Sequence, residues 1–393
     1  MEQWTEIRAT DFIEFNPRMS IKKGTIATKV AMDKLQPFTK KIPDSEKASF
    51  SGGSKFRNGD TIMARITPCL ENGKTAFVDI LGKDEVAFGS TEFIVMRARE
   101  GISDPQFIYY LATSPWFRNI AIKSMVGSSG RQRVQQSVLD DLVLNVPPLE
   151  EQKKITSFLC VLDQKIALNN EINDNLEQQV QAYFQELFVD NADPAWTLGT
   201  ISDLGTVVGG STPSKSKPEY YTEDGIAWIT PKDLSINKAK FISHGENDIT
   251  ELGLKNSSAS IMPEGTVLFS SRAPIGYIAI ASGEVTTNQG FKSVVPKPEI
   301  GTAYVYCFLK HNLPVIEGMA SGSTFKEVSG STMKNVPAVI PDTETLTCFN
   351  DFCAPIFAHQ RILEEQNQSL AALRDSLLPK LMSGEIDVSA IQL

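Results

Sequence analysis

The chain has 393 residues, 41% of them hydrophobic and 22% charged, proportions typical of a globular protein with room for two to three domains. No apolar run reaches the length of a membrane span, and Met1-Glu-Gln-Trp4 lacks the basic and apolar regions of a signal peptide. Five cysteines without a CxxC pair and three scattered histidines argue against a metal site. We therefore expect no metal or other cofactor, no membrane partner, and a reducing, cytoplasmic location.

The formal net charge of −9 is unevenly distributed along the chain. Residues 149–192 and 342–393 each carry −5, whereas residues 1–148 carry +3 and residues 193–341 carry −2. The two globular segments are thus near neutral, and a near-neutral domain can still present a basic face to a partner. Charge alone favours no class of partner.

The first 148 residues predict an α+β domain, because short apolar runs alternate with glycine and proline. The predicted strands lie within 56–68, 75–80 and 92–97, and the predicted helix within 104–126. Residues 149–192 differ in character. From Ile155 onward apolar side chains recur every seven residues in a polar segment largely free of helix breakers, which predicts one long amphipathic helix.

Residues 193–341 repeat the α+β scheme, and residues 342–393 repeat the heptad pattern. In this second copy the predicted strands lie within 227–230, 266–270, 276–281 and 291–295, and the predicted helix within 302–321. Two prolines bear on the long helix of the last segment. We expect Pro355 in or before its first turn and expect Pro379 to end or kink it.

The two halves are related by an offset of 194 residues that holds without a gap for about sixty residues. The matched pairs include Met125 and Met319, Val134 and Val328, Pro147 and Pro341, Phe158 and Phe352, and Leu187 and Leu381. An earlier match at a different offset relates 59–68 to 265–274. Such a long repeat predicts two whole domains in tandem, each closed by the same helix, with a pseudo-two-fold relation.

The two long helices are expected to pack as an antiparallel pair, although each stripe could instead cover only its own domain. Asn173 and Asn367 occupy equivalent heptad sites. A buried asparagine weakens such a seam but fixes its register, so we assign helix-pair register to these two residues.

Three motifs suggest an enzyme but fail on detail. The segment Gly73-Lys74-Thr75 resembles the end of a nucleotide-binding loop, yet position 68, where that loop needs glycine, is proline. The segment Asn145-Val-Pro-Pro resembles an amino-methyltransferase motif but has an inserted valine and no following aromatic residue. Asp44 with Glu46 and Lys47 lacks the alternating spacing of a metal-dependent nuclease. The sequence therefore predicts no catalytic centre.

Polar loops carry more information than these motifs. Long hydrogen-bonding side chains follow glycine or end apolar runs in both halves, and arginine, asparagine and glutamine are the side chains that make bidentate contacts to base edges. For any one loop a capped turn is the alternative, and Arg272 could equally form a structural ion pair. The loops are 127–133, 209–213, 228–233, 270–276 and 287–290.

Together these segments resemble the specificity subunit of a type I restriction–modification system. Residues 196–213, 218–221 and 228–234, followed by 272–276 and 287–291, are similar to a target-recognition domain of that family, and 65–68 and 71–73 match it less closely. Residues 146–152 resemble the central conserved region and 377–384 the C-terminal one. The second conserved region departs at 341–346, so the start of its helix is not fixed by the resemblance.

The resemblance implies an α+β fold with two tandem target-recognition domains separated by two long antiparallel coiled-coil helices. Its divisions are residues 1–148 for target-recognition domain 1, 149–192 for the central conserved helix, 193–341 for target-recognition domain 2 and 342–393 for the C-terminal conserved helix. It implies a non-catalytic chain that binds double-stranded DNA with a bipartite target. Each domain reads one half, the helix pair sets the spacer and docks two methyltransferase subunits, and motor/endonuclease subunits join through the complex.

The alternative from another class is a non-DNA scaffold or peptide-binding protein with a coiled-coil spacer. A self-sufficient methyltransferase or nuclease is disfavoured by the absent motifs. The candidate DNA-binding residues are Arg65, Lys74, Arg131, Gln132, Arg133, Ser211, Thr212, Lys232, Arg272, Asn288, Gln289 and Lys326.

Overall fold

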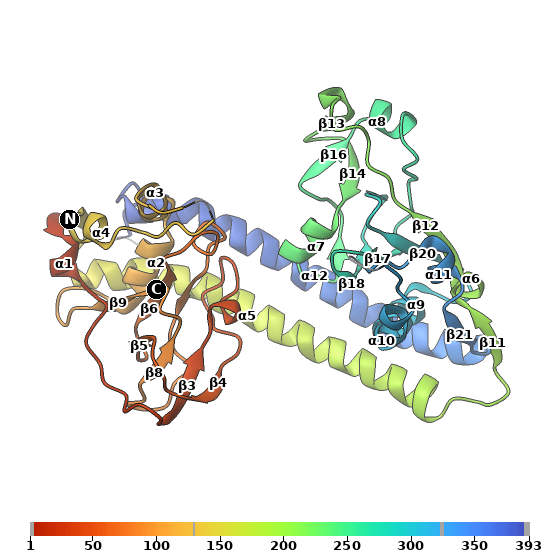
Figure 1. Cartoon of the computed structure of the whole chain (residues 1–393), viewed down its shortest axis with the longest axis horizontal. Coiled ribbons are helices and arrows are strands. Elements are labelled where there is room, and N and C mark those ends of the chain that lie inside the picture. Colours follow the sequence, from red (N-terminus) through yellow and green to blue (C-terminus); the bar gives the residue numbers. More distant parts are fainter. Residues whose placement is uncertain (1–3, 129, 323–325, 389–393) are drawn as a thin grey trace. The chain divides into compact units, whose positions relative to one another are not determined.

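The structure, a computed structural model, describes residues 4–128, 130–322 and 326–388. It divides into two units (Figure 1). The first unit comprises Met1–Leu168 with Asn367–Leu393, and the second comprises Asn169–Gln366. None of the helices within the described ranges is long and apolar enough to cross a membrane.

The first unit contains three antiparallel or mixed sheets, several short helices and the first part of one long helix. A four-stranded sheet in the order β2-β9-β6-β7 packs against α2, and a second sheet has the order β4-β3-β8-β5, in which β3 and β8 are parallel. Strands β1 and β10 form a separate antiparallel pair. The elements are β1 (Thr5–Arg8), α1 (Ala9–Phe12), β2 (Ile13–Phe15), β3 (Ile26–Val30), η1 (Met32–Lys34), β4 (Glu46–Ser49), β5 (Ser54–Phe56), β6 (Thr61–Ala64), β7 (Thr75–Phe77), β8 (Ala87–Gly89), β9 (Phe93–Ala98), α2 (Pro105–Thr113), α3 (Pro115–Lys123), α4 (Gln136–Asp140), β10 (Val143–Val146) and the first part of α5 (Leu149–Gln185).

The second unit follows the same plan. One sheet has the order β12-β20-β17-β18-β15, another has the order β13-β16-β14-β19, and β11 pairs with β21. Its elements are η2 (Glu186–Asp190), β11 (Thr197–Thr200), α6 (Ile201–Leu204), β12 (Gly205–Gly209), η3 (Pro218–Tyr220), β13 (Tyr221–Thr222), β14 (Ile226–Ile229), α7 (Pro231–Ile236), β15 (Phe241–Ile242), β16 (Asn247–Ile249), α8 (Glu251–Lys255), β17 (Val267–Ser271), β18 (Ile275–Ala281), β19 (Thr286–Thr287), β20 (Lys292–Pro296), α9 (Thr302–His311), α10 (Leu313–Gly318), α11 (Gly330–Lys334), β21 (Pro337–Ile340) and the first part of α12 (Thr343–Met382).

The α+β class and the strands predicted in both halves are confirmed, but each single predicted helix is two helices. In the first unit Ser114 adopts extended backbone angles and its hydroxyl accepts a hydrogen bond from the Phe117 nitrogen, so a new helix begins at Pro115. Proline has no N–H to continue the preceding helix, and serine is a favoured N-cap. In the second unit the break falls at Asn312, before the Leu313-Pro314 start of α10.

The repeat holds at the level of secondary structure. At the 194-residue offset α4 corresponds to α11 and β10 to β21 with identical bounds, and the starts of α5 and α12 also coincide. The earlier match is confirmed as well, because Gly59 and Gly265 both have positive φ in the turns that precede β6 and β17. Left-handed backbone of this kind favours glycine. The tandem repeat is therefore structural.

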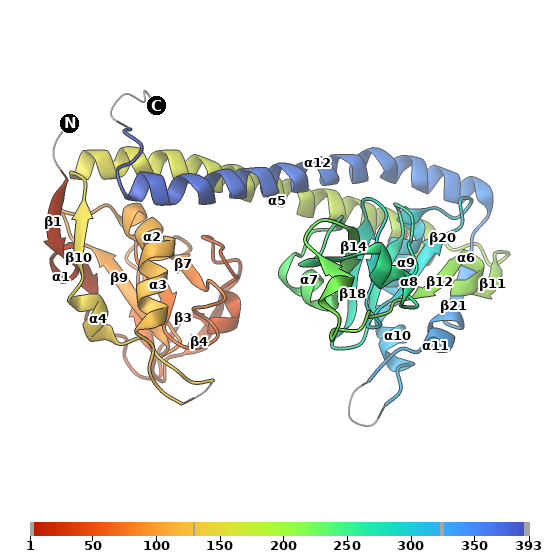
Figure 2. The same cartoon turned by 90° about the horizontal axis from the view of Figure 1, so that it is seen from above.

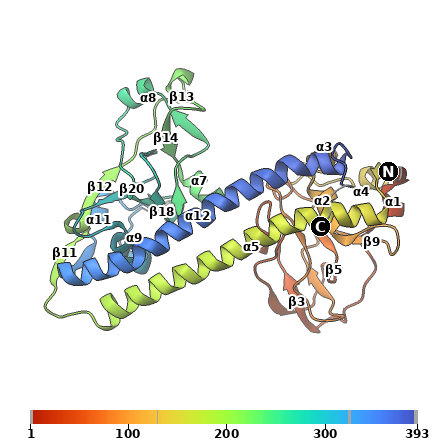
Figure 3. The same ribbon diagram turned by 180° about the vertical axis from the view of Figure 1, so that it is seen from behind.

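The long helices α5 and α12 pass through both units. In the first unit Ile155 and Leu159 share a core with Leu378 and Leu381, and α2 lies alongside this pair of helix segments (Figure 2). In the second unit Val180 and Phe184 share a core with Tyr304 and Phe349, where α9 lies against both long helices (Figure 3).

Polar contacts in the second unit fix the helix direction. The amide of Asn169 reaches Gln366 at 3.5 Å, and the amide of Gln360 donates to the backbone oxygen of Asn173 at 3.1 Å. Residue numbers therefore rise along one helix as they fall along the other. Lys240, which is buried, contacts both Glu177 of α5 and Gln360 of α12, so it ties the second unit to both helices.

The expectation for Pro355 is wrong, because helix α12 begins at Thr343 and Pro355 lies well inside it. Helix α12 ends at Met382, three residues beyond Pro379, and the expected kink at Pro379 stays a prediction. The true start of α12 is set by Asp342, whose carboxylate accepts a hydrogen bond from the Thr345 nitrogen at 2.9 Å. An aspartate at this position satisfies N–H groups that the first helical turn leaves unpaired.

Candidate nucleic-acid interface

Five loops of the second unit meet at the ends of strands β12, β14 and β17 and the start of β20. We call residues 209–213, 229–233, 270–273, 287–292 and 326–328 the second loop cluster. Backbone hydrogen bonds join its members: the Ser211 nitrogen donates to Thr287, the Asn288 nitrogen to Ile229 and the Ser271 nitrogen to Gly290, over 2.7–3.0 Å. The Val328 nitrogen donates to Ser271 at 3.0 Å. Every candidate residue of the second half therefore lies in one region.

The glycine-rich loop of this cluster needs its second glycine. A Cβ on Gly210 would collide with the carbonyl oxygens of Thr287 and Asn288. The close approach places Ser211 and Thr212 beside the 287–290 loop, and the Thr212 hydroxyl bonds the exposed side chain of Gln289. The side-chain oxygen of Asn288 accepts from the Gly290 nitrogen at 2.8 Å, which leaves its amide NH₂ as a donor.

Lys232 is positioned by the start of α7. Thr230 and Asp233 form a capping box, in which the Asp233 carboxylate accepts from the Thr230 nitrogen at 2.7 Å. Lys232 is the second residue of α7, and its amine lies 2.6 Å from the Glu246 carboxylate. The Lys232 side chain is 62% exposed. Its hydrogen bond to Glu246 raises the pKa of the Lys232 amine. The amine is thus charged and accessible.

Arg272 follows the last residue of β17 and lies 3.5 Å from the Glu327 carboxylate, with both side chains 38% exposed. Lys292 lies 3.9 Å from the same carboxylate. Burial lowers the pKa of Lys292, and Glu327 opposes that shift. One carboxylate therefore holds two cations at the ends of adjacent strands.

The first unit gathers fewer loops at the corresponding place. We call residues 65–67, 92 and 126–134 apart from 129 the first loop cluster. Glu92 forms a bidentate ion pair with Arg133, with distances of 2.7 and 3.0 Å from Nη2 and Nε. The hydrogen bond from Arg133 lowers the pKa of Glu92. The Gln132 carbonyl accepts from the Thr67 nitrogen at 3.0 Å, and Arg131 is exposed.

The two clusters share one backbone frame. The Val134 nitrogen donates to the Arg65 carbonyl at 2.9 Å, as the Val328 nitrogen donates to the Ser271 carbonyl at 3.0 Å. The Arg65 nitrogen in turn donates to Glu92, as Ser271 donates to Gly290. The same three segments therefore meet in the same way in both units.

Two candidates of the first half donate hydrogen bonds to backbone carbonyls. The amine of Lys74 donates to the Met32 carbonyl at 2.9 Å, and it joins none of the first-cluster loops by a hydrogen bond among the described residues. Arg65 is half-buried and donates to the Val134 carbonyl at 3.4 Å. Lys326, in contrast, is exposed beside Glu327.

The residues assigned to helix register lie in different units, Asn173 in the second and Asn367 in the first. Both are half-buried, whereas Asn169, one turn before Asn173, is completely buried. The register role of Asn173 and Asn367 stays a prediction. The structure adds Asn169 and the buried pair of Asp163 and Arg374 as polar members of the seam.

Sequence reasoning also missed Glu92, Lys292 and Glu327. The ion pairs of the two carboxylates join residues 41 and 55 positions apart, which no local pattern reveals. One signal was available, because the 194-residue offset sets Arg133 on Glu327 and so marks a charge reversal inside the repeat.

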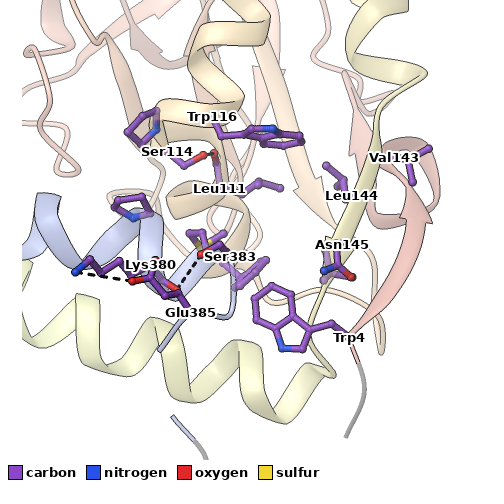
Figure 4. A pocket seen from close by; sticks show the side chains of 15 residues that line it. Trp4, Leu111, Ser114, Trp116, Val143, Leu144, Asn145, Lys380, Ser383 and Glu385 are labelled. Carbon is purple, nitrogen blue, oxygen red and sulfur yellow. Dashed lines mark hydrogen bonds and ion pairs between the residues drawn. The ribbon is translucent and has the colours of Figure 1, made fainter. Parts of the chain in front are cut away.

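A separate cavity of about 710 Å³ lies in the first unit between β10, the α2–α3 junction and the end of α12 (Figure 4). Its walls are mainly apolar, with Trp4, Leu111 and Trp116 among them, and Lys380 pairs with Glu385 at 4.0 Å on its lining. It shares no lining residue with the first loop cluster. Among the residues with described positions, no three histidine, cysteine or acidic side chains are arranged to hold a metal ion.

Comparison with known proteins gives the family. The chain is 40% identical over 191 residues to the MjaIX specificity subunit of Methanocaldococcus jannaschii, a match that covers 46% of this chain and 44% of that protein. It is 26% identical over 411 residues to the HindI specificity subunit of Haemophilus influenzae, covering 84% and 87% of the two chains. The fold is similar to that of the S subunit from M. genitalium, with a TM-score of 0.54, 16% identity and 96% coverage of both chains. The model of the type I restriction modification DNA specificity domain matches residues 1–178 and 195–366, so the chain belongs to that family.

Proposed function

We propose that this chain is the sequence-reading subunit of a type I restriction–modification complex and that each unit reads one half of a bipartite DNA target. The observation that carries the proposal is the shared backbone frame of the two loop clusters, because it presents different long polar side chains from the same place in each unit. A repeated frame with different side chains suits two half-sites of different sequence.

The side chains divide by chemistry into two roles. Lys232, Lys326 and Arg131 are exposed cations suited to phosphate. Arg133 and Arg272 can read guanine, and Asn288 with Gln289 can read adenine, through paired donors and acceptors. We assign Ser211 and Thr212 to contacts with the sugar–phosphate backbone of the DNA. We expect no direct DNA contact from Lys74 and Arg65, because their side chains donate to protein backbone carbonyls.

The helices α5 and α12 set the spacer between the half-sites and dock two methyltransferase subunits, and motor/endonuclease subunits join through that complex. Methylation and cleavage belong to those partners, so the chain has no catalytic role of its own. The four-part division at residues 148, 192 and 341 corresponds to these roles.

Two measurements test the proposal. The chain is expressed with its methyltransferase partner in a host lacking other adenine methylation, and methylated adenines are mapped by single-molecule sequencing. We expect one split sequence with a fixed unread gap. Fluorescence anisotropy of the purified complex on a matched duplex should weaken steeply with salt, because phosphate contacts release counterions. Salt-independent behaviour with no mapped sequence would favour the protein-binding scaffold.

A further inference from the structure

Each unit forms an arginine–carboxylate ion pair at one equivalent position of the repeat, which carries an arginine in the first unit and a glutamate in the second. In the first unit the arginine, Arg133, comes from the segment after α3 and the carboxylate, Glu92, from the turn before β9. In the second unit the segment after α10 supplies the carboxylate, Glu327, and the end of β17 supplies the arginine, Arg272. Arg133 and Glu327 are equivalent positions of the repeat.

The place of the pair is nevertheless the same. Arg133 and Glu327 each precede the valine whose nitrogen donates to the residue at the end of the central strand, Arg65 or Ser271. Each also sits in an isolated antiparallel bridge with its own loop, Arg133 with Val126 and Glu327 with Ser321. An arginine beside a carboxylate is therefore built at one point of the frame from different positions of the chain.

The geometry leaves part of each arginine available. Arg133 uses Nε and Nη2 for Glu92, and its Nη1 donates to the Arg131 carbonyl at 3.5 Å. A guanidinium has five N–H donors in a fixed plane, so one N–H of Nη1 and one of Nη2 remain on the edge that faces away from the carboxylate. That outer edge is the one that matches the O6 and N7 acceptors of guanine. Arg272 uses Nη1 for Glu327 at 3.5 Å and keeps its other donors.

We propose that Glu92 and Glu327 are positioning residues for sequence specificity: each holds the arginine beside it in the orientation that reads one base pair of its half-site. The inference rests on the proposed function and adds the residues that set its selectivity. A held arginine loses less side-chain freedom on binding than a free one, and a carboxylate fixes the plane of the fork. A carboxylate beside DNA also repels phosphate, so its removal should raise general binding while it lowers discrimination.

The test uses the complete complex with methyltransferase subunits and duplexes in which one half-site is randomised. Bound sequences are selected and counted for the wild type and for E92Q and E327Q. For E327Q we expect discrimination at one base pair of the second half-site to fall about tenfold, with the first half-site unchanged, and E92Q should give the mirror result. The control is E264Q, which breaks the Glu264–Arg361 pair of 2.6 Å at the opposite end of β17 and should leave both preferences intact.

Each outcome decides one question. If the wild type selects no split sequence, the proposed function fails. If the wild type selects a split sequence but E92Q and E327Q keep every base preference, the carboxylates do not position the arginines and the inference is wrong. Tighter binding of all sequences by these variants would then show that the carboxylates only repel phosphate. Should either glutamine variant fail to fold, R133K and R272K serve in its place. Lysine keeps the charge but lacks the planar fork, so base preference should fall with the salt dependence retained, and an unchanged preference would contradict the inference.

Discussion

The guanidinium of Arg374 lies 2.8 Å from the carboxylate of Asp163 and joins α12 to α5 within the first unit. Only 14% and 10% of the two side chains are exposed, and the Tyr110 hydroxyl donates to Asp163 at 2.6 Å. Burial alone would lower the pKa of Arg374, but Asp163 and Asp375 together outweigh that effect and raise it. The heptad pattern places Arg374 in the seam, where an apolar residue is usual, so the pair replaces apolar packing with a specific contact.

Replacing Asp163 with alanine should destabilise the first unit by about 3 kcal/mol, because it leaves a buried guanidinium without its main partner. We expect a loss of stability at the lower end of the range for broken buried ion pairs, because Asp375 still contacts Arg374 at 2.8 Å. Urea unfolding of the purified chain measures it. The matched control, Asp375→Ala, removes a carboxylate that is 63% exposed and should cost under about 1 kcal/mol. Equal costs for the two variants would contradict this account.

Acid should weaken the start of α12 through Asp342. Hydrogen bonds from the Thr345 nitrogen, the Thr345 hydroxyl and Trp196 lower the pKa of Asp342 from 3.8 to about 2. Because the folded pKa lies below the ordinary value, this stabilisation is present above pH 3.8 and is lost as the pH falls toward about 2. Asp342→Asn keeps a good N-cap but cannot titrate.

The measurement is the melting temperature followed by far-ultraviolet circular dichroism over that pH range. The wild type should lose more stability on acidification than Asp342→Asn, and the two proteins should differ little near neutral pH. Parallel curves for the two proteins would show that Asp342 contributes no pH dependence.

The sequence predicts much of the fold because the fold is repetitive. Apolar periodicity identifies the strands and both long helices, and the 194-residue offset read from the sequence also relates the bounds of α4 to those of α11. The sequence analysis did not predict the breaks before Pro115 and Pro314, because apolar periodicity continues across both. At the first break, serine followed by proline is a helix-start signal. Pro355 was misplaced because the N-cap at Asp342, which accepts from the Thr345 nitrogen three residues later, was not recognised as the helix start, although an aspartate at that position is a local helix-start signal.

The sequence predicts the candidate site less completely than the fold, because the ion pairs of the site join segments that are distant in the chain. Loop motifs identify Ser211, Arg272 and Asn288 because each stands where a strand ends. The partners that decide how an arginine is held, Glu92 and Glu327, come from distant segments. A lysine held by a carbonyl, such as Lys74, has the same sequence signature as a free one. Local patterns therefore identify the loops, and only the fold assigns roles within them.

Lengthening both long helices should lengthen the unread gap of the target. Four residues inserted after Leu168 in α5 and four after Gln366 in α12, where the two units divide, each add about 6 Å of helix. Mapping of methylated adenines should then give the same two half-sequences with a longer gap. The control is four residues inserted after Asn191, outside the long helices, which should leave the gap unchanged. A mapped target with the old gap in the lengthened protein would exclude the helices as the spacer.

Arg272 and Lys232 should differ in the kind of binding they contribute. Arg272→Ala should cost roughly 1–3 kcal/mol at one base pair of the second half-site, because a missing bidentate contact lowers discrimination only there. Lys232→Ala should weaken all sequences alike and reduce the slope of log affinity against log salt by about one, as expected for one phosphate contact. Lys255→Ala, which removes a cation paired with Glu251 on α8, is the control for net charge. Fluorescence anisotropy on matched and half-mismatched duplexes at several salt concentrations separates the three. If Arg272→Ala leaves binding unchanged at every sequence, its pair with Glu327 serves only the fold, and the second unit reads DNA through Asn288 and Gln289 instead.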